Sequence, residues 1–214
     1  MIETKNESPA GEKPTRREES RMATRALLLD AAVSSLIDIG VARTTTLEVQ
    51  RRAGVSRGAL LHHFPSHAEL LSATIEELVR RNESSVRQTR ARLTGRSDPV
   101  ERAIQTLAAT VSQPSYMAEL ELWAVARTDP DLRAALVAAE RPARKENERV
   151  VAEVFAQVSD RPGYAPVVAI SLEFLRGLAI SGVLRRSPAR RQQLISQWTW
   201  AARLLLEQEF PVDS

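Results

Sequence analysis

Residues 45–64 read TTLEVQRRAGVSRGALLHHF, and this stretch decides the fold. Thr45 and Glu48 have the spacing of a capping box, in which the threonine hydroxyl accepts from the Glu48 N–H and the Glu48 carboxylate reaches back to the Thr45 N–H. We expect a short helix from there through Ala53. Gly54 then permits a sharp turn, because glycine adopts left-handed backbone angles at little cost.

A second short helix should begin directly after that turn. Ser56 is a good N-cap, and the helix is expected to run from Arg57 to about Phe64. The apolar residues with the spacing to pack the two helices together are Val49, Ala53, Val55 and Leu60. That packing leaves on the outer face Arg57, Gly58, Leu61 and His62. The pattern is typical of a helix-turn-helix, whose second helix meets base edges in the major groove of DNA.

Helical patterns also surround this motif. Apolar residues recur at helical spacing from Met22 to Ile39, and Gly40 follows as a helix terminator. Residues 66–69 form a second capping box, which opens a long helix to about Leu93. Further helices are expected near 99–112, 115–127, 130–158, 164–186 and 188–208, with Pro142 kinking or dividing the helix that contains it. Strand-like alternation of useful length is missing, so the predicted fold class is all-α.

The chain divides into three parts. Residues 1–20 are polar and without periodicity, which predicts a disordered arm. Residues 21–65 should form a three-helix DNA-binding domain, and residues 66–214 a larger helical domain with a plain linker at 94–99. The net charges of these parts are −1, +3 and +1. The positive excess lies in the segment that carries the motif, although a solvated basic face would give the same count.

Composition limits the function classes. The 214 residues include no Cys, which fits a reducing compartment, and the N-terminus lacks a secretory signal, so we expect a cytoplasmic protein. We see no apolar run that approaches the roughly 20 residues needed to span a bilayer. The sequence also offers no nucleophile elbow, phosphate loop or dinucleotide fingerprint, which argues against an enzyme.

The histidines cluster at His62, His63 and His67. The last two have a spacing seen in zinc sites. Pro65 interrupts the helix that would align them, and no carboxylate motif accompanies them. We therefore expect no metal and no cofactor, with His63 as a packing residue and His62 facing DNA.

The stretch from Arg21 to about Val79 resembles the DNA-binding domain of the tetracycline-repressor (TetR) family. The resemblance is carried, in order and without gaps, by Leu29–Ala32, Gly40, Thr44–Thr45, Ala53–Leu60, His62–Ser66 and Glu69–Leu71. It implies that the DNA contacts come from Thr44, Thr45, Ser56, Arg57, Gly58, Leu61, His62 and His67. Arg51 and Arg52 lie on the preceding helix, and the sequence leaves two interpretations for them: contact with DNA, or a solvated helix face.

Four positions depart from the family pattern. The family usually has Tyr at position 61, Lys at 67, Ala at 50 and Phe at 36, where this chain has Leu61, His67, Gln50 and Leu36. Leu36 is a conservative core exchange. Leu61 can still contact a thymine methyl group, and His67 can donate to a phosphate at a helix N-terminus.

The resemblance also implies an effector pocket in the C-terminal domain, without saying which residues form it. Residues that can line a mostly apolar pocket are Tyr116, Met117, Leu120, Trp123, Phe155, Phe174 and Arg176. Packing in an ordinary helical core explains each apolar residue of this set equally well. Arg176, like Arg127, can meet an anionic ligand or pair with Glu121 or Glu173. The excess of apolar residues favours a lipophilic or amphipathic effector.

The family forms its dimer through the last two helices as a four-helix bundle. The expected interface has a small-residue face on one helix and an apolar stripe on the other: Gly177, Ser181, Gly182, Leu194, Trp198, Ala201, Ala202 and Leu205. Internal core is the other interpretation of the stripe.

Together the motif and the resemblance predict a homodimeric, ligand-responsive regulator that binds a palindromic DNA operator and is released from it by a small molecule. The alternative is a helical sensor or partner-binding protein without DNA binding.

Overall fold

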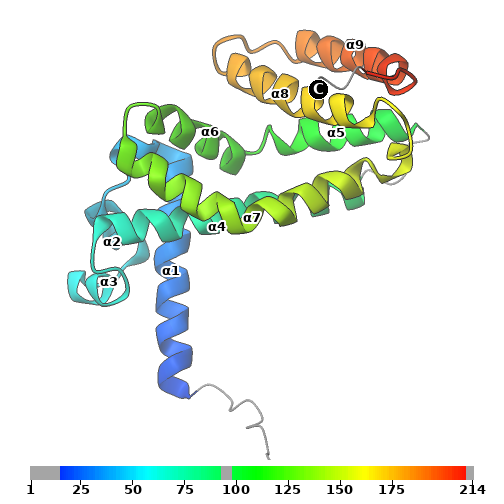
Figure 1. The fold of residues 1–214 in the computed structure, drawn as a ribbon. Helices are drawn as coiled ribbons and strands as arrows, with labels where there is room; N and C mark the ends of the chain where they lie inside the picture. Colours follow the sequence, from blue (N-terminus) through cyan, green and yellow to red (C-terminus); the bar gives the residue numbers. More distant parts are fainter. Residues whose placement is uncertain (1–14, 93–97, 211–214) are drawn as a thin grey trace, which may run out of the picture.

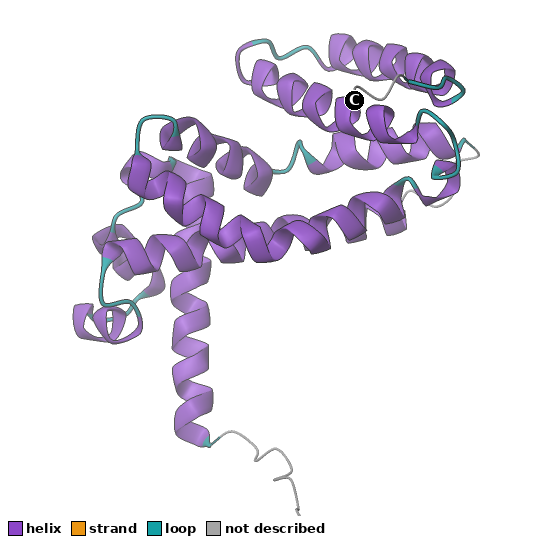
Figure 2. Cartoon of the chain, viewed as in Figure 1, coloured by secondary structure: helices purple, strands orange, loops and turns teal. Residues whose placement is uncertain are grey.

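The computed structural model describes residues 15–92 and 98–210, and the regular structure in these ranges is helical (Figures 1 and 2). The elements are α1 (Arg16–Ile39), the 3-10 turn η1 (Val41–Arg43), α2 (Thr46–Ala53), α3 (Arg57–His63), α4 (His67–Arg92), α5 (Pro99–Thr110), α6 (Pro114–Ala126), α7 (Pro130–Val154), the 3-10 turn η2 (Ala156–Val158), α8 (Tyr164–Leu184) and α9 (Pro188–Leu206). This arrangement confirms the all-α prediction.

The molecule has a head, a middle and a far end. Helices α2 and α3 lie beside α1 and the start of α4 and form the head (Figure 1). The long helices α4 and α7 run from there through the middle, where α6 packs on both. At the far end, α8 and α9 lie together over α5. The functional head and the α8–α9 pair are therefore at opposite ends of the chain's fold.

Three apolar cores follow the same order. The head core contains Leu28, Leu29, Ala31, Ala32, Val49, Ala53, Leu60, Phe64 and Leu70. The middle core contains Val33, Leu36, Ile75, Leu78, Val79, Ala118, Leu122, Ala126, Leu132, Leu136 and Ala139. The far core is built on α5, α8 and α9 and includes Phe155, Leu175, Ile195 and Leu206. Since α1 and α4 contribute to both of the first two cores, the head is packed onto the middle rather than tethered to it, and its core extends past residue 65 to Leu70.

Two helices differ from their expected form. Helix α1 begins at Arg16 instead of Met22, so residues 16–20 are helical rather than part of a disordered arm. The reason is a complete capping box, in which Thr15 accepts from the Glu18 N–H and the Glu18 side chain accepts from the Thr15 N–H. Helix α7 runs through Pro142 without division. The rest of the expected arm and residues 94–97 of the expected linker lie outside the described residues.

Helix α8 is more apolar than the sequence analysis recognised. Over residues 164–184 it is long and apolar enough to cross a membrane by length and composition, which corrects the expectation that no segment approached that length. Helices that pack in a protein interior or interface have the same composition. Only 17% of its most apolar window is buried within the chain. Much of the apolar surface of α8 is therefore uncovered in the single chain.

Gly163 permits the closest backbone approach in the far end. Its N–H donates to the Leu206 carbonyl over 3.1 Å, and a Cβ at this position would collide with the main-chain carbonyl of Leu205. We predict that Gly163→Ala lowers the free energy of unfolding by about 2–4 kcal/mol, because main chain on both sides must move. Denaturant unfolding followed by circular dichroism measures this loss.

Gly58→Ala is the matched control for this substitution. The nearest side-chain atom to a Cβ there is the Ser56 Oγ at 4.0 Å, so the change should stabilise α3 by about 0.5–1 kcal/mol. Equal stabilities for the two variants would contradict the proposed backbone collision at Gly163.

Candidate nucleic-acid interface and effector site

The turn between α2 and α3 has the geometry that its sequence predicts. Gly54 adopts left-handed angles, φ 65° and ψ 28°, directly after α2. The Ser56 hydroxyl accepts from the Ala59 N–H over 3.2 Å and caps α3. Val49 and Leu60 are buried in the head core with Ala53, and Val55 packs against it. These contacts fix α3 against α2 and set which face of α3 points outward.

That outward face carries the four expected residues. Arg57, Gly58, Leu61 and His62 are exposed, and Leu61 remains 41% accessible although it is apolar. An accessible leucine beside a cation at the start of a short helix is suited to contact with base edges and thymine methyl groups.

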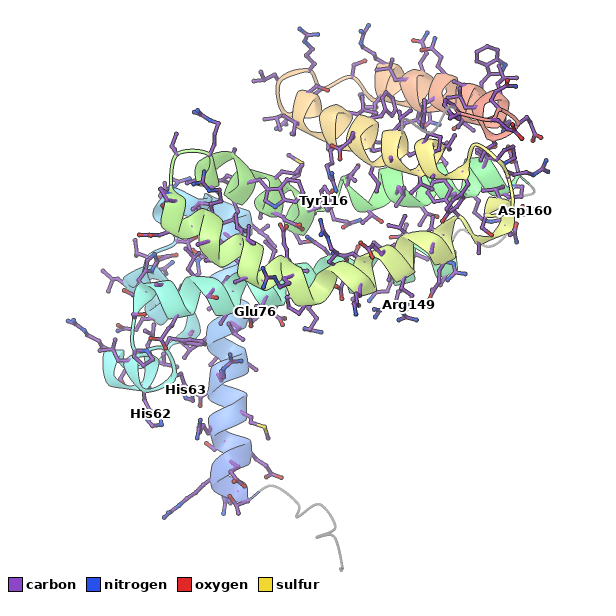
Figure 3. The ribbon with its side chains drawn as sticks, viewed as in Figure 1. His62, His63, Glu76, Tyr116, Arg149 and Asp160 are labelled. Atoms are coloured by element: carbon purple, nitrogen blue, oxygen red, sulfur yellow. The ribbon has the colours of Figure 1, made fainter. Side chains whose placement is uncertain are left out.

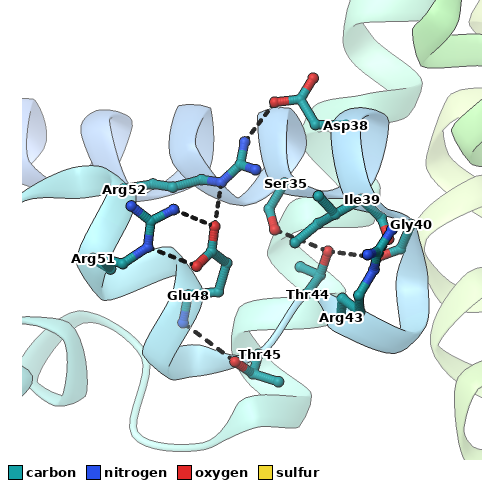
Figure 4. Close-up of polar contacts among 10 residues, drawn as sticks. All are labelled: Ser35, Asp38, Ile39, Gly40, Arg43, Thr44, Thr45, Glu48, Arg51 and Arg52. Atoms are coloured by element: carbon teal, nitrogen blue, oxygen red, sulfur yellow. Dashed lines mark hydrogen bonds and ion pairs between the residues drawn. The ribbon is translucent and has the colours of Figure 1, made fainter.

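Glu48 organises the outer side of α2 (Figure 4). Its N–H donates to the Thr45 hydroxyl over 3.2 Å, which is half of the expected capping box. Its carboxylate does not return to the Thr45 N–H, because it accepts instead from Arg51 and Arg52 over 2.6–2.8 Å. The hydrogen bonds from these two arginines, Arg51 first, lower the pKa of Glu48 to about 2. Both arginines are therefore held by intramolecular ion pairs, Arg52 also by Asp38.

Thr44 lies inside the head rather than on its surface. The side chain is 7% exposed. Its hydroxyl donates to the Gly40 carbonyl over 2.9 Å and lies within hydrogen-bond distance of the Ser35 hydroxyl, at 3.1 Å, as Figure 4 shows. The Thr44 N–H donates to the Val41 carbonyl. With both donors used internally, the expected DNA contact by Thr44 does not fit its position. Its neighbour Thr45 is exposed at the N-cap of α2.

The histidines occupy the edge of the head. His62 and His63 end α3, with ring centroids 5.4 Å apart, and Figure 3 labels both beside α1. His63 is half-buried, and burial lowers its pKa, with further lowering from the positive charges of His62, Arg21 and Arg25. His67 is exposed at the first position of α4, where Ser66 accepts from the Glu69 N–H. Within the described residues, no group of three or more His, Asp or Glu side chains is placed to hold a metal ion.

The expected pocket residues separate into three places: a groove, the far core, and a contact between α6 and α8. Met117 and Leu120 line the groove, which has a volume of about 480 Å³, together with residues of α1, α6 and α8: Leu36, Ile37, Pro114, Ala118, Glu121, Ala124, Ile180 and Val183. Phe155 is 1% exposed in the far core. Phe174 packs on Trp198, with ring centroids 5.8 Å apart. The groove has the volume typical of small-molecule sites, roughly 300–1,000 Å³.

Tyr116, Trp123 and Arg176 meet at a different place, between α6 and α8. The Arg176 guanidinium lies 5.0 Å from the centre of the Trp123 ring, and its Nε donates to the Tyr116 hydroxyl over 3.0 Å. Glu173 pairs with the same guanidinium over 2.5 Å, so one of the pairings left open by the sequence is formed. Burial raises the pKa of Tyr116.

Sequence reasoning missed the polar residues around this arginine. Glu119 accepts from the Asn82 side-chain amide, and Glu140 accepts from the Trp123 indole N–H over 2.7 Å. Burial raises the pKa of Glu119 to about 7. A signal was present: Glu119 is three residues after Tyr116 and four before Trp123, so it shares their helix face. An acidic residue on a helix face with two aromatic residues is unusual, and this pattern could have indicated a functional position.

Glu121 connects α6 to the head. Its carboxylate accepts from the Val41 N–H over 2.8 Å, at the turn that leads from α1 into α2. Gly40, with φ 79°, brings this turn so close that a Cβ would lie 2.6 Å from the Glu121 Oε1 atom. The helix that lines the groove therefore also holds the beginning of the helix-turn-helix.

The expected dimer residues are only partly at the surface. Gly177 and Ser181 are exposed and Gly182 is half-buried, whereas Leu194 and Ala201 are half-buried. Trp198 donates to the Ser171 hydroxyl over 2.9 Å and packs with Ala202 and Leu205 in the far core of the same chain. These three residues of the α9 stripe thus pack as internal core, the other interpretation given by the sequence. The exposed large apolar residues of α9 are Trp200 and Leu204, whose side chains are 63% and 52% exposed.

The head matches a family of known regulators. Residues 28–74 match the family model described as bacterial regulatory proteins, tetR family. The head therefore carries an N-terminal domain of the tetR family. Among curated relatives, the HTH-type transcriptional regulator CymR of Pseudomonas putida is 28% identical over 82% of this chain and 87% of its own length. BetI of Burkholderia cenocepacia is 34% identical over 53% of this chain and 60% of its own length.

An uncharacterized HTH-type transcriptional regulator of Mycobacterium tuberculosis is 30% identical over 56% of this chain, and the match spans 61% of that relative. Solved structures resemble the whole fold. A putative TetR-family regulator from Rhodococcus sp. superposes with a TM-score of 0.62 at 21% identity, covering 87% of this chain and 99% of the other. The multidrug binding protein EbrR, complexed with imidazole, gives 0.56 at 19%, covering 89% and 96%. The tetR fold thus extends beyond the matched head.

The raised pKa of Glu119 has a consequence for the stability of this tetR-type fold. Between pH about 4.5 and 7 the folded chain keeps the Glu119 proton while the unfolded chain releases it, so stability falls as pH rises through this window. We predict that Glu119→Gln, which removes the titration, is more stable than the wild type by about 3 kcal/mol at pH 8 and equal to it below pH 4.5.

Thermal or urea unfolding across pH measures this difference. Glu153→Gln removes one carboxylate outside the cluster, from a group paired with Arg90 and Arg149, and serves as the control. A wild type and a Glu119→Gln variant whose stabilities run parallel from pH 4 to pH 8 would show that Glu119 is not desolvated.

Proposed function

We propose that the protein is a ligand-controlled transcriptional regulator that binds DNA as a homodimer. The observation that carries the proposal is the outward face of α3, where Arg57, Leu61 and His62 are exposed on a helix fixed by the Gly54 turn and the Ser56 cap. A short helix presented in this way fits the major groove. The curated relatives are named as transcriptional regulators, which supports regulation rather than catalysis. Such a function belongs in the cytoplasm.

Base reading and backbone positioning fall to different residues in this proposal. Arg57 can present two parallel N–H donors to guanine, and Leu61 can meet a thymine methyl. Thr45 and His67 stand at the exposed N-terminal ends of α2 and α4, where backbone N–H groups and the helix dipole favour phosphate.

A second copy is needed to read a palindromic operator. The exposed apolar residues of α8 and α9 are Ile170, Ile180, Val183, Leu184, Trp200 and Leu204. They lie on the α8–α9 pair, away from α2 and α3 (Figure 1), and Ile180 and Val183 also line the groove. Exposed apolar side chains on these two helices favour pairing of two chains there. A two-fold dimer of this kind can place its recognition helices in successive major grooves, about 34–36 Å apart.

Effector control is proposed to act through α6. This helix lines the groove, carries Tyr116 and Trp123, and holds the Val41 N–H with Glu121. A ligand that binds more tightly to the conformation with one position of α6 shifts the equilibrium toward the head orientation that goes with it. The size of the shift is limited to the difference in the ligand's affinity for the two conformations. Release of DNA on ligand binding would make the protein a repressor.

We predict that Arg57→Ala weakens binding to the operator by about 1–3 kcal/mol and relaxes specificity at one base pair in each half-site. His67→Ala should weaken binding to operator and scrambled DNA alike, because a phosphate contact carries no sequence information. Fluorescence anisotropy with both DNAs at two salt concentrations separates the two effects.

Arg80→Ala is the control for charge, since Arg80 is exposed on α4 beyond the head and pairs with Glu77. It should leave both affinities nearly unchanged. Equal losses on operator and scrambled DNA for Arg57→Ala would mean that α3 does not read bases, and absence of any DNA binding by the wild type would favour a sensor without DNA binding.

We predict that Trp200→Glu converts the dimer to a folded monomer with weak DNA binding, because a buried, unpaired carboxylate is costly at a dimer interface. Light scattering at micromolar concentration gives the mass, and circular dichroism checks the fold. Val137→Glu places the same charge on an apolar side chain of α7 that is 54% exposed, and should remain dimeric. A monomeric wild type, or a dimeric Trp200→Glu variant, would contradict the α8–α9 interface.

A further inference from the structure

A cluster of polar and aromatic side chains lies inside the middle of the fold, between α4, α6, α7 and α8. We call it the Glu119 cluster, and its members are Asn82, Tyr116, Glu119, Trp123, Glu140 and Arg176. Figure 3 labels Tyr116 at the inner end of α6, where these helices meet. None of these residues belongs to the DNA-facing surface of the head, so DNA binding does not explain why polar groups are placed here.

Glu119 is a half-buried carboxylate that forms no ion pair with a cation among the described residues. Its hydrogen bond comes from the neutral amide of Asn82, and no ion pair reaches it from the described residues. Burial raises its pKa to about 7 against the lowering effect of the Asn82 hydrogen bond. The negative charges of Glu140 and Glu83 add to the rise, and the positive charge of Arg176 opposes it. A positive group that comes into contact with a desolvated carboxylate stabilises its ionised form strongly, because little water is present to do so.

Asn82 supplies a second, independent sign of an unfilled site. Its side chain is 7% exposed, and its Oδ1 atom is buried without a hydrogen-bond partner among the described residues. Its amide nitrogen is fixed on Glu119, so the free oxygen lies at the same cluster. Unpartnered buried acceptors are rare and costly in folded proteins. This atom can accept from a donor group or contact the polarised C–H groups of a cation.

Arg176 shows what kind of group the cluster accommodates. Its planar guanidinium lies over the Trp123 ring at 5.0 Å and bonds the Tyr116 hydroxyl, so an internal cation already uses the aromatic face. Its partner Glu173 has a side chain that is 73% exposed. Arg176 can therefore turn outward along Glu173 while keeping its ion pair.

We propose that the Glu119 cluster binds an aromatic or amphipathic organic cation, which takes the place of the Arg176 guanidinium on Trp123 and pairs with Glu119. The inference rests on the proposed function, because it names the class of effector for the C-terminal domain. An anionic ligand would meet Glu119, Glu140 and Glu83, and the one cation of the cluster is already paired. A neutral ligand would leave the Glu119 charge uncompensated.

The test uses two probes of the same shape, one cationic and one neutral. 3-Hydroxyphenyltrimethylammonium carries a quaternary nitrogen where 3-tert-butylphenol carries a carbon, so the pair differs in charge alone. Calorimetry with DNA-free protein at pH 8, where Glu119 is largely ionised, should show at least about tenfold tighter binding of the cation. Equal binding of the two probes, or tighter binding of the phenol, would overturn the proposal.

Variants connect the preference to the cluster. Glu119→Gln keeps an acceptor for Asn82 and removes the charge, so it should lose about tenfold in cation affinity and stay within about twofold for the phenol. Arg176→Gln removes the internal competitor and should bind the cation several-fold more tightly. Glu153→Gln, with the same change in net charge elsewhere, should match the wild type. Unchanged cation binding in Glu119→Gln, or weaker binding in Arg176→Gln, would each refute the assignment.

DNA release distinguishes failure of this inference from failure of the proposed function. If the wild type binds DNA and only neutral or anionic compounds release it, the regulator stands and the cation site is wrong. If the protein binds no DNA at all, the regulator is wrong, and the calorimetry still decides the cation site.

Discussion

The hydrogen bond from the Val41 N–H to the Glu121 carboxylate joins α6 to the turn that begins the helix-turn-helix. It depends on glycine at position 40, because φ is positive there (79°) and a Cβ would lie 2.6 Å from the Glu121 Oε1 atom. Buried contacts of α1 and α6 in the middle core hold the same junction. Through it, the position of the head is set by a helix of the C-terminal domain, and the two parts of the fold cannot shift independently.

Helix α6 accordingly has different surroundings on each side. One side lines the groove with Met117 and Leu120, and another carries Tyr116, Glu119 and Trp123 toward α7 and α8. Core packing alone would favour apolar residues throughout. The polar residues on the second side come at a cost in stability, which is the usual sign that a position serves binding rather than folding.

The sequence predicted the head well because its signals are local. Gly54 and Ser56 determine the turn and the cap through their own backbone chemistry, and the apolar spacing determines which face of α3 is buried. Partners that compete for one side chain were not predictable: Glu48 prefers Arg51 and Arg52 to the Thr45 N–H. Nor does periodicity say what covers an apolar face. Trp198 and Trp200 are two residues apart and thus on nearly opposite faces of α9, and only the fold shows that the first is internal.

The early start of α1 bears on how the head behaves in solution. The thirteen residues from Thr15 to Leu27 include none that is buried. This part of the helix is therefore supported mainly by its capping box and by local propensity, and by the Arg25 guanidinium, which lies 5.3 Å from the centre of the Phe64 ring. Its backbone amides therefore exchange hydrogen with solvent through local opening, at a free-energy cost far below that of global unfolding. The amides from Leu28 onward are protected by the head core. A sharp step in exchange rate within one continuous helix therefore separates the part of α1 that the head core protects from the part that only local helix stability protects.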